Sequence, residues 1–170
     1  MTEKIAVIGD THINSFKLLP YEILRYIRGV EWVIHVGNYI SLSVLRSFEK
    51  VKGKNFIGVY GNADPLNIRE KLNSEEIVEI QGIRIGITNP IVGGHEQYVA
   101  RRVLGKFAKN DLDCIVYGHT HHPKITTIKG ILLINPGKGY IENNSFNKSA
   151  YIAIITIGKR INVEIKEISH

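Results

Sequence analysis

Five apolar segments of this chain end in polar residues that could hold a metal ion. The first leads into Asp10 and His12, and the last leads into His119 and His121. The three segments between them end in amides: Asn38, Asn62 and Asn89. Carboxylate and imidazole are the strong ligands of this set, and an amide oxygen is a weaker, uncharged one. If the segments are strands, their carboxyl ends can converge on one place, as they do in open α/β sheets.

Two pairs of these residues are separated by a single position, Asp10 from His12 and His119 from His121. Side chains two apart on an extended segment point the same way, so each pair can offer two ligands to one side. Asp-x-His alone is more often a capping carboxylate with a histidine packed nearby. His-x-His is more specific, because two close imidazoles cost desolvation unless something uses them.

The elements that must position these residues alternate in the first third of the chain. Apolar periodicity predicts strand 4–9, helix 15–28, strand 32–36, helix 41–50 and strand 55–60. Four apolar residues share one face of the first helix: Phe16, Leu19, Ile23 and Ile27. This β-α-β alternation implies parallel strands joined by right-handed crossovers.

The rest of the chain is richer in strands. Gln81-Gly82 predicts a two-residue turn between strands 76–80 and 83–88, followed by a helix over 96–108. Five more strands are expected at 113–117, 124–128, 131–135, 150–157 and 160–168. We expect the later antiparallel strands to form a second sheet packed on the first. The predicted fold class is α/β, a four-layer sandwich of two mixed β-sheets flanked by helices.

Length and composition predict one domain over residues 1–170. No apolar stretch approaches the roughly 20 residues needed to cross a bilayer, so we expect no membrane span. The N-terminal residues lack the pattern of a signal peptide, which favours the cytoplasm. The lone Cys114 lies in an apolar segment and fits a small core residue in a reducing compartment.

The net charge of +6 raises the question of nucleic-acid binding, because Lys and Arg contacts to phosphates dominate such binding. The two densest basic stretches, 46–54 and 101–109, are interrupted by apolar residues and lack stacked aromatics. We therefore favour solvated faces over a nucleic-acid partner, with a modest attraction to anionic substrates. The expected partner is a small phosphorylated substrate, and a homo-oligomer is left open.

Taken together, the motifs resemble those of the calcineurin-like metallophosphoesterase superfamily, in particular its small single-domain phosphodiesterases of bacteria and archaea. The resemblance extends from Ile5 to about Gly137. It rests on these segments in this order: Gly9-Asp10-Thr11-His12, Gly37-Asn38, Gly61-Asn62-Ala63-Asp64, Thr88-Asn89-Pro90, Gly118 to Pro123, and Asn135-Pro136-Gly137-Lys138. In the family, two metal ions share a bridging aspartate and a water that attacks phosphorus in line.

The resemblance implies two ligand sets in this chain. One metal ion would use Asp10, His12, His121 and the bridging residue, here Asn38. The other would use Asn38, Asn62, His119 and Asn89, which replaces a histidine. His119 and Asn62 are also the implied catalytic residues. The metal could be manganese, nickel, iron or zinc.

The two sets are unequal in charge. A carboxylate about 4 Å from a unit positive charge is worth roughly 4 kcal/mol at an effective dielectric near 20, and the second set has no carboxylate. We therefore expect one firm metal site and one weak site. An alternative is that the amides belong to loops that bind no metal.

Several neighbouring residues have open roles. Asp64 could orient a metal-bound imidazole or serve a turn before Pro65. His95 could be a replacement ligand, although a helix cap is favoured, and His35 is expected in the core. Asn62, His122 and Lys138 are the candidate substrate-binding residues. Ala63 replaces the histidine that larger family members use as a general acid, which favours substrates with good leaving groups.

The leading functional hypothesis is a metal-dependent phosphoesterase that hydrolyses a phosphodiester or phosphate ester by metal-activated water. The alternative is a catalytically degenerate protein of this fold, acting as a binding or scaffold module. The substitutions at Asn38 and Asn89 favour the scaffold. Retention of the other ligand residues favours the enzyme: Asp10, His12, Asn62, His119 and His121.

Overall fold

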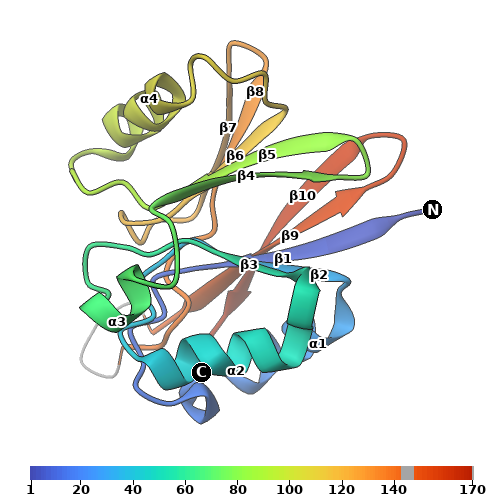
Figure 1. The fold of residues 1–170 in the computed structure, drawn as a ribbon. Helices are drawn as coiled ribbons and strands as arrows, with labels where there is room; N and C mark the ends of the chain where they lie inside the picture. The colour runs from blue at the N-terminus through green and yellow to red at the C-terminus, as the bar shows by residue number, and fades with distance from the viewer. Residues whose placement is uncertain (143–147, 170) are drawn as a thin grey trace.

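Two mixed β-sheets pack face to face, and helices cover their outer faces (Figure 1). The protein was studied as a computed structural model that describes residues 1–142 and 148–169. Within these residues each sheet has five strands. The layers run α1 and α2, first sheet, second sheet, α4, so the four-layer sandwich predicted from the sequence is confirmed.

The first sheet has the strand order β10-β9-β1-β2-β3. Strands β1, β2 and β3 are parallel, and β9 and β10 are antiparallel to their neighbours. Its strands are β1 Glu3–Ile8, β2 Trp32–His35, β3 Phe56–Gly58, β9 Ala150–Ile157 and β10 Ile161–Ile168.

The second sheet has the order β4-β5-β6-β8-β7. Strand β6 is parallel to both neighbours, whereas β4 and β7 pair antiparallel at the edges. Its strands are β4 Glu75–Ile80, β5 Ile83–Thr88, β6 Cys114–Tyr117, β7 Lys124–Ile128 and β8 Ile131–Asn135. Gln81 and Gly82 form the predicted two-residue turn, both with positive φ.

Helices connect the strands on the outer faces. The α-helices are α1 Tyr21–Gly29, α2 Leu42–Lys52, α3 Leu66–Arg69 and α4 Glu96–Lys106. Two 3₁₀ turns accompany them, η1 Phe16–Leu18 and η2 Gly53–Asn55. Helices α1 and α2 cover the first sheet, and α4 covers the second (Figure 1).

Two sequence-based expectations are wrong. The single helix over 15–28 is two elements, because Pro20 lacks an amide hydrogen and separates η1 from α1. The later strands do not all join the second sheet, since β9 and β10 return to the first sheet beside β1. The short helix α3 was not anticipated, because four residues are too few for a periodic pattern.

The buried side chains form three layers of apolar packing. The first lies between the first sheet and helices α1 and α2, and includes Ile23, Ile27 and Phe48. The second lies between the two sheets, and the third lies under α4. Cys114 is buried between the sheets as expected, and burial raises the pKa of its thiol to about 12.

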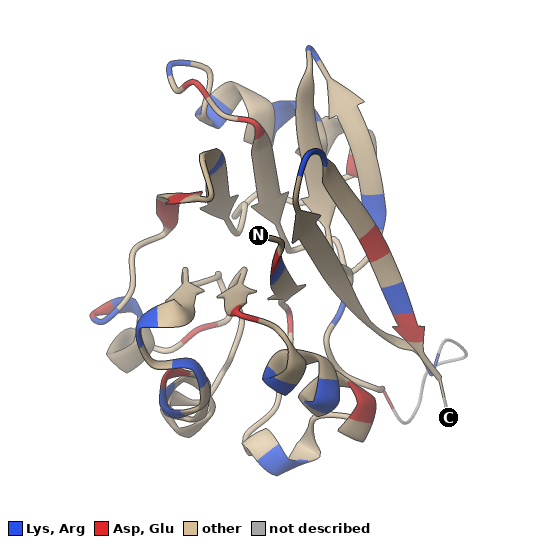
Figure 2. Ribbon diagram, turned by 90° about the vertical axis from the view of Figure 1, so that its right-hand side faces the viewer, with Lys and Arg blue, Asp and Glu red and all other residues tan. Residues whose placement is uncertain are grey.

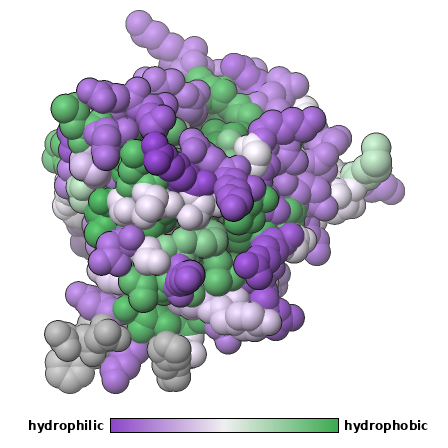
Figure 3. Space-filling model, turned by 60° about the horizontal axis from the view of Figure 1, so that its bottom comes forward, coloured by the Kyte–Doolittle hydropathy of each residue, from purple (hydrophilic) through white to green (hydrophobic). Residues whose placement is uncertain are grey.

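The charged residues are dispersed. Lys and Arg lie on helices, turns and β10 among Asp and Glu rather than on one face (Figure 2). On the α1 and α2 side, hydrophobic side chains are interspersed with hydrophilic ones (Figure 3). Among the described residues, no helix is both long and apolar enough to cross a membrane.

Candidate metal centre

The five predicted strand ends meet around the carboxylate of Asp10, which is fully buried. Its Oδ1 accepts hydrogen bonds from Nδ2 of Asn38 at 2.9 Å and of Asn89 at 3.5 Å. Its Oδ2 accepts the backbone N–H of His119 at 2.8 Å. The amide of Asn38 also donates to Oδ1 of Asn62 at 3.3 Å. One network therefore connects the ends of β1, β2, β3, β5 and β6.

Three strong ligand residues lie together in this network. The potential ligand atoms of Asp10, His12 and His121 all lie within 4.8 Å of one another. Oδ1 of Asp10 is 4.0 Å from Nε2 of His12 and 3.8 Å from Nε2 of His121. Nε2 of His12 is buried and, within the described part of the chain, has no hydrogen-bond partner. An unpaired buried nitrogen beside a carboxylate and a second imidazole fits a divalent ion.

Burial keeps His12 in the form that binds metal. Desolvation lowers the pKa of its imidazole, and nearby His121 lowers it further. The carboxylate of Asp10 acts in the opposite direction without reversing the shift. At neutral pH the imidazole is therefore uncharged, and a ring lone pair is available to a cation.

The backbone at these positions is not extended, contrary to the geometry assumed for the Asp-x-His and His-x-His pairs. Five non-glycine residues of the centre have positive φ: Asp10 at 46°, His12 at 45°, Asn38 at 64°, His119 at 88° and His121 at 64°. Such conformations cost free energy and concentrate at functional sites. The ligands converge because their loops turn sharply at the strand ends.

Asn38 presents a donor to the centre. Its Nδ2 points at Asp10 and Asn62, and its Oδ1 accepts the backbone N–H of Ala63 at 2.9 Å. Turning the amide over would place its oxygen against the acceptor oxygens of Asp10 and Asn62 and its nitrogen against the N–H of Ala63, which is unfavourable. In this orientation the amide offers no oxygen to a bridging metal ion.

Asn89 is similarly engaged through its nitrogen. Its Nδ2 donates to the carbonyl of Val36 at 2.7 Å, as well as to Asp10. Its Oδ1 is buried and has no hydrogen-bond partner among the described residues. His119 packs close to Gly93, where an added Cβ would lie 2.8 Å from Nε2 of the imidazole.

Asp64 organises the loops around Asn38. Its carboxylate accepts three backbone N–H groups, from Asn38, Ile40 and Gly61, each at 2.8 Å. It is 2% exposed. Of its two proposed roles, these contacts support the structural one, in which Asp64 fixes the turns at the ends of β2 and β3.

His35 lies in the core, as predicted, and is fully buried. Its Nδ1 accepts the backbone N–H of Gly37 at 3.1 Å, so its Nε2 carries the proton that faces Thr11. Its ring stacks on Tyr39 with centroids 3.7 Å apart. Burial lowers the pKa of this imidazole well below its usual value.

Sequence reasoning missed a polar cluster under the loop that carries His119 and His121. The carboxylate of Glu96, at the start of α4, accepts hydrogen bonds from the hydroxyls of Tyr117 and Thr120. Asn135 donates to Thr120 at 2.8 Å. In the sequence, Glu96 is only an acidic residue in a first helical turn, so no local pattern identifies it.

The other candidate residues lie at the periphery. His95 is at the N-cap position of α4 but makes no side-chain cap hydrogen bond, and His122 is exposed beside it. Nζ of Lys138 is 3.4 Å from Oε2 of Glu142 and lies over the ring of Tyr140. The Tyr140 ring is also 5.6 Å from that of His12, so it borders the centre.

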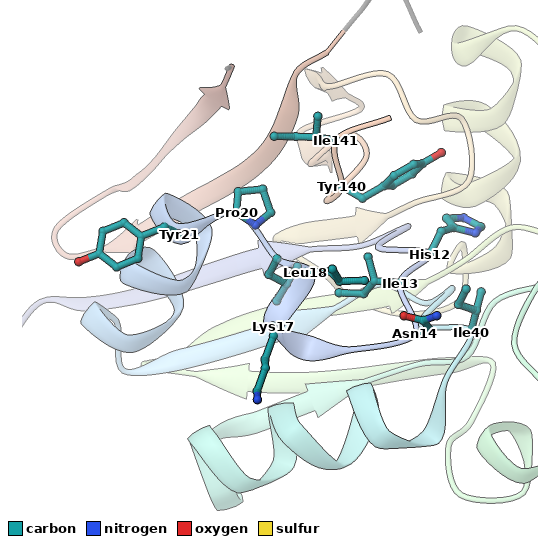
Figure 4. A pocket seen from close by; sticks show the side chains of 11 residues that line it. His12, Ile13, Asn14, Lys17, Leu18, Pro20, Tyr21, Ile40, Tyr140 and Ile141 are labelled. Atoms are coloured by element: carbon teal, nitrogen blue, oxygen red, sulfur yellow. The ribbon is translucent and has the colours of Figure 1, made fainter. Parts of the chain in front are cut away.

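Two cavities flank the centre. A groove of about 620 Å³ begins at His12 and Tyr140 and extends to Pro20 and Tyr21 (Figure 4). Leu18, on its wall, is 61% exposed. Asn62 and Asn89 line a separate cavity of about 310 Å³. This second cavity also includes two cationic residues that the motifs did not identify, Arg69 and Lys106.

Two mixed sheets flanked by helices, with candidate metal ligands at the strand ends, are the arrangement of the metallophosphoesterase fold. The sequence matches the calcineurin-like phosphoesterase superfamily domain over residues 4–160. The chain therefore belongs to this superfamily.

Individual relatives agree with this assignment. A phosphodiesterase of Methanocaldococcus jannaschii is 33% identical over 152 residues, which cover 81% of this chain and 86% of the relative. A Thermotoga maritima protein solved by NMR is 27% identical with a TM-score of 0.73, covering 98% and 99% of the two chains. The crystal structure of Vps29 of Entamoeba histolytica in complex with Zn²⁺ has a TM-score of 0.72 and covers 97% of this chain and 98% of Vps29. The two sequences are 20% identical, so the similarity is one of fold alone.

Proposed function

We propose that this protein is a metal-dependent phosphoesterase that hydrolyses a small phosphodiester or phosphate ester. The observation that carries the proposal is the cluster of Asp10, His12 and His121, in which a buried imidazole nitrogen has no partner among the described residues. The cluster opens onto the groove that begins at His12. A substrate can therefore have its phosphoryl group at the ligands and its remaining part in the groove.

The residues of the centre fall into three groups by proposed task. Asp10, His12 and His121 would hold a divalent ion such as manganese, nickel, iron or zinc. Such an ion lowers the pKa of a bound water and neutralises charge that develops on phosphate. Asn38 and the backbone N–H of His119 orient the Asp10 carboxylate. By the family motif, Asn62 and His119 are the candidate contacts to the reacting phosphate.

We infer that a second metal ion binds weakly or not at all. Asn38 turns its amide nitrogen toward the centre, and neither Asn62 nor Asn89 brings a charge. Without a second ion and with Ala63 in place of a proton donor, the leaving group gains little assistance. Activated esters should therefore be hydrolysed much faster than alkyl esters.

The experiment compares the natural chain with the double variant Asn38→Asp/Asn89→His. Hydrolysis of bis(p-nitrophenyl) phosphate is measured with Mn²⁺ or Ni²⁺, and bound metal is counted after dialysis. We expect activity and about one retained ion in the natural chain. If the natural chain is inactive and the double variant hydrolyses the ester, the proposal is rejected. Asp10→Asn provides the inactive control.

A binding or scaffold role is the second candidate. The observation that favours it is the amide orientation of Asn38, which pairs with Asp10 without any metal ion. Under this alternative, a bound metal ion would affect only the stability of the fold and would give no hydrolysis. Retention of an ion that raises the melting temperature but gives no turnover with activated esters would support it.

A further inference from the structure

The cavity beside Asn62 and Asn89 has the charge of an anion site. Where the family motif places a carboxylate and an imidazole, this chain has Asn38 and Asn89. The same cavity of about 310 Å³ is lined by Arg69 and Lys106. A second divalent cation would therefore find no carboxylate among its implied ligands and two positive charges beside them.

Arg69 is held firmly at the edge of this cavity. Its Nε donates to the carbonyl of Asp64 at 2.7 Å, and its Nη2 donates to the carbonyl of Asn62 at 2.6 Å. Its guanidinium also lies 5.6 Å from the ring centre of Tyr60. These two hydrogen bonds use two of five N–H groups, so the planar fork retains donors for a phosphate oxygen.

Lys106 is tethered to the residue that precedes Asn89. Its Nζ is 3.2 Å from Oγ1 of Thr88 and 2.9 Å from Oε2 of Glu75. The side chains of Lys106 and Glu75 are 38% and 49% exposed, so their ion pair is weak and can exchange for another anion. The described residues that line the cavity include Arg69 and Lys106 and no acidic residue, so with Glu75 included one positive charge remains in excess.

The amides complete the set of hydrogen-bonding groups. Oδ1 of Asn62 accepts from Asn38, so its amide nitrogen is the group that can donate to a ligand. Asn89 is 3% exposed, and its Oδ1 has no hydrogen-bond partner among the described residues. It can accept a hydrogen bond from a singly protonated phosphate.

We propose that Arg69 and Lys106 form a phosphate-binding subsite in the place that the family motif gives to the second metal ion. Asp10, His12 and His121 would hold an ion next to the phosphoryl group, and Arg69 and Lys106 would bind phosphate oxygens from the cavity that they line. The proposal takes its ligand class, a phosphate ester, from the function proposed above. Binding of inorganic phosphate tests it without any turnover.

The test is calorimetric titration of inorganic phosphate into the chain loaded with one equivalent of Zn²⁺. Lys106→Met should weaken phosphate binding about tenfold, the effect of losing one charge-assisted hydrogen bond. Arg69→Met should act in the same direction, with urea unfolding used to verify that each variant is folded. Lys109→Met is the matched control, because it removes one exposed positive charge from the region after α4.

A second arm uses the background of Asn38→Asp/Asn89→His with two equivalents of Zn²⁺. There a second ion should bind phosphate, and Lys106→Met should lose most of its effect. Unchanged phosphate affinity in folded Lys106→Met and Arg69→Met would overturn the subsite. So would an equal loss in Lys109→Met, which would indicate a general charge effect. Phosphate binding without ester hydrolysis would reject the proposed function alone.

Discussion

At the scale of single residues, Asn38 stands where the family motif has an aspartate. A hydrogen bond to Asp10 therefore takes the place of a second negative charge. The amide nitrogen of Asn38 lies 2.9 Å from Oδ1 of Asp10. An aspartate at position 38 would repel the Asp10 carboxylate unless a cation lay between the two carboxylates. The hydrogen bond between Asn38 and Asp10 is therefore favourable without a cation between the two side chains. The same amide, with its nitrogen turned toward Asp10, is the reason why we expect the second metal site to be weak.

Asn38→Asp should make folding depend on metal. Without metal, two carboxylates in contact will lower the melting temperature, whereas excess Mn²⁺ will raise it above that of the metal-free variant through binding to the folded state. Thermal unfolding with EDTA and with Mn²⁺ measures both effects. The natural chain, measured in parallel, should respond less to Mn²⁺. Equal responses in both proteins would contradict this account of Asn38.

Asp64→Ala should destabilise the chain by about 3 kcal/mol. The substitution leaves buried N–H groups of Asn38 and Gly61 without an acceptor, and each unsatisfied group costs about 1–3 kcal/mol. Urea unfolding measures the loss. Asp111→Ala, at an exposed position, is the control and should change stability by less than about 0.5 kcal/mol.

At the scale of elements, the end of β2 gives the protein a pH-dependent stability. Buried His35 has a pKa well below the usual 6.5, so it stays neutral in the folded chain while the unfolded chain takes up a proton below about that pH. The free energy of unfolding should fall as pH decreases from 7 toward 5, by up to about 1.4 kcal/mol per pH unit.

His35→Gln provides the matched comparison, because a glutamine can accept from Gly37 and donate to Thr11. Urea unfolding at several pH values should show a smaller slope in this variant. His12, whose pKa is also lowered, accounts for part of the slope that remains. Identical slopes in the two proteins would show that His35 does not cause the pH dependence.

Element types were largely predictable because the strands are continuous apolar segments and the hairpins have glycine-containing turns. The break at Pro20 could have been recognised, since proline opens helices more readily than it lies within them. The return of β9 and β10 to the first sheet could not, because pairing between distant strands leaves no local signal. The motifs in the sequence predicted the candidate metal ligands. Glu96, Arg69 and Lys106 lie in no such motif, so no sequence pattern predicted them.

At the scale of the whole molecule, the groove and the charge distribution favour small substrates. The groove holds about 620 Å³, and Lys and Arg are dispersed rather than aligned in a track (Figure 2). Fluorescence anisotropy with labelled single-stranded DNA should give no saturable binding at about 0.15 M salt. Hydrolysis of bis(p-nitrophenyl) phosphate under the same conditions is the positive control. Tight DNA binding would contradict the small-substrate assignment.

The position of β1 within its sheet has a further consequence. This strand, which carries Asp10, lies between β2 and β9, so its second neighbour comes from residues 150–157. A chain that ends at Lys148 contains every implied metal ligand but lacks that neighbour. We expect it to retain no Zn²⁺ after dialysis and to lose the cooperative unfolding transition seen in the full chain. Retention of one ion in the shortened chain would contradict this.

During synthesis, the centre should therefore form late. All of its ligands emerge from the ribosome before residue 122, yet the strand that presents Asp10 remains an unpaired edge until the C-terminal hairpin has been made. In this interval the three candidate ligand side chains of the nascent chain have no fixed geometry. Metal loading is then expected only after β9 and β10 have been translated, because these strands complete the sheet that holds Asp10.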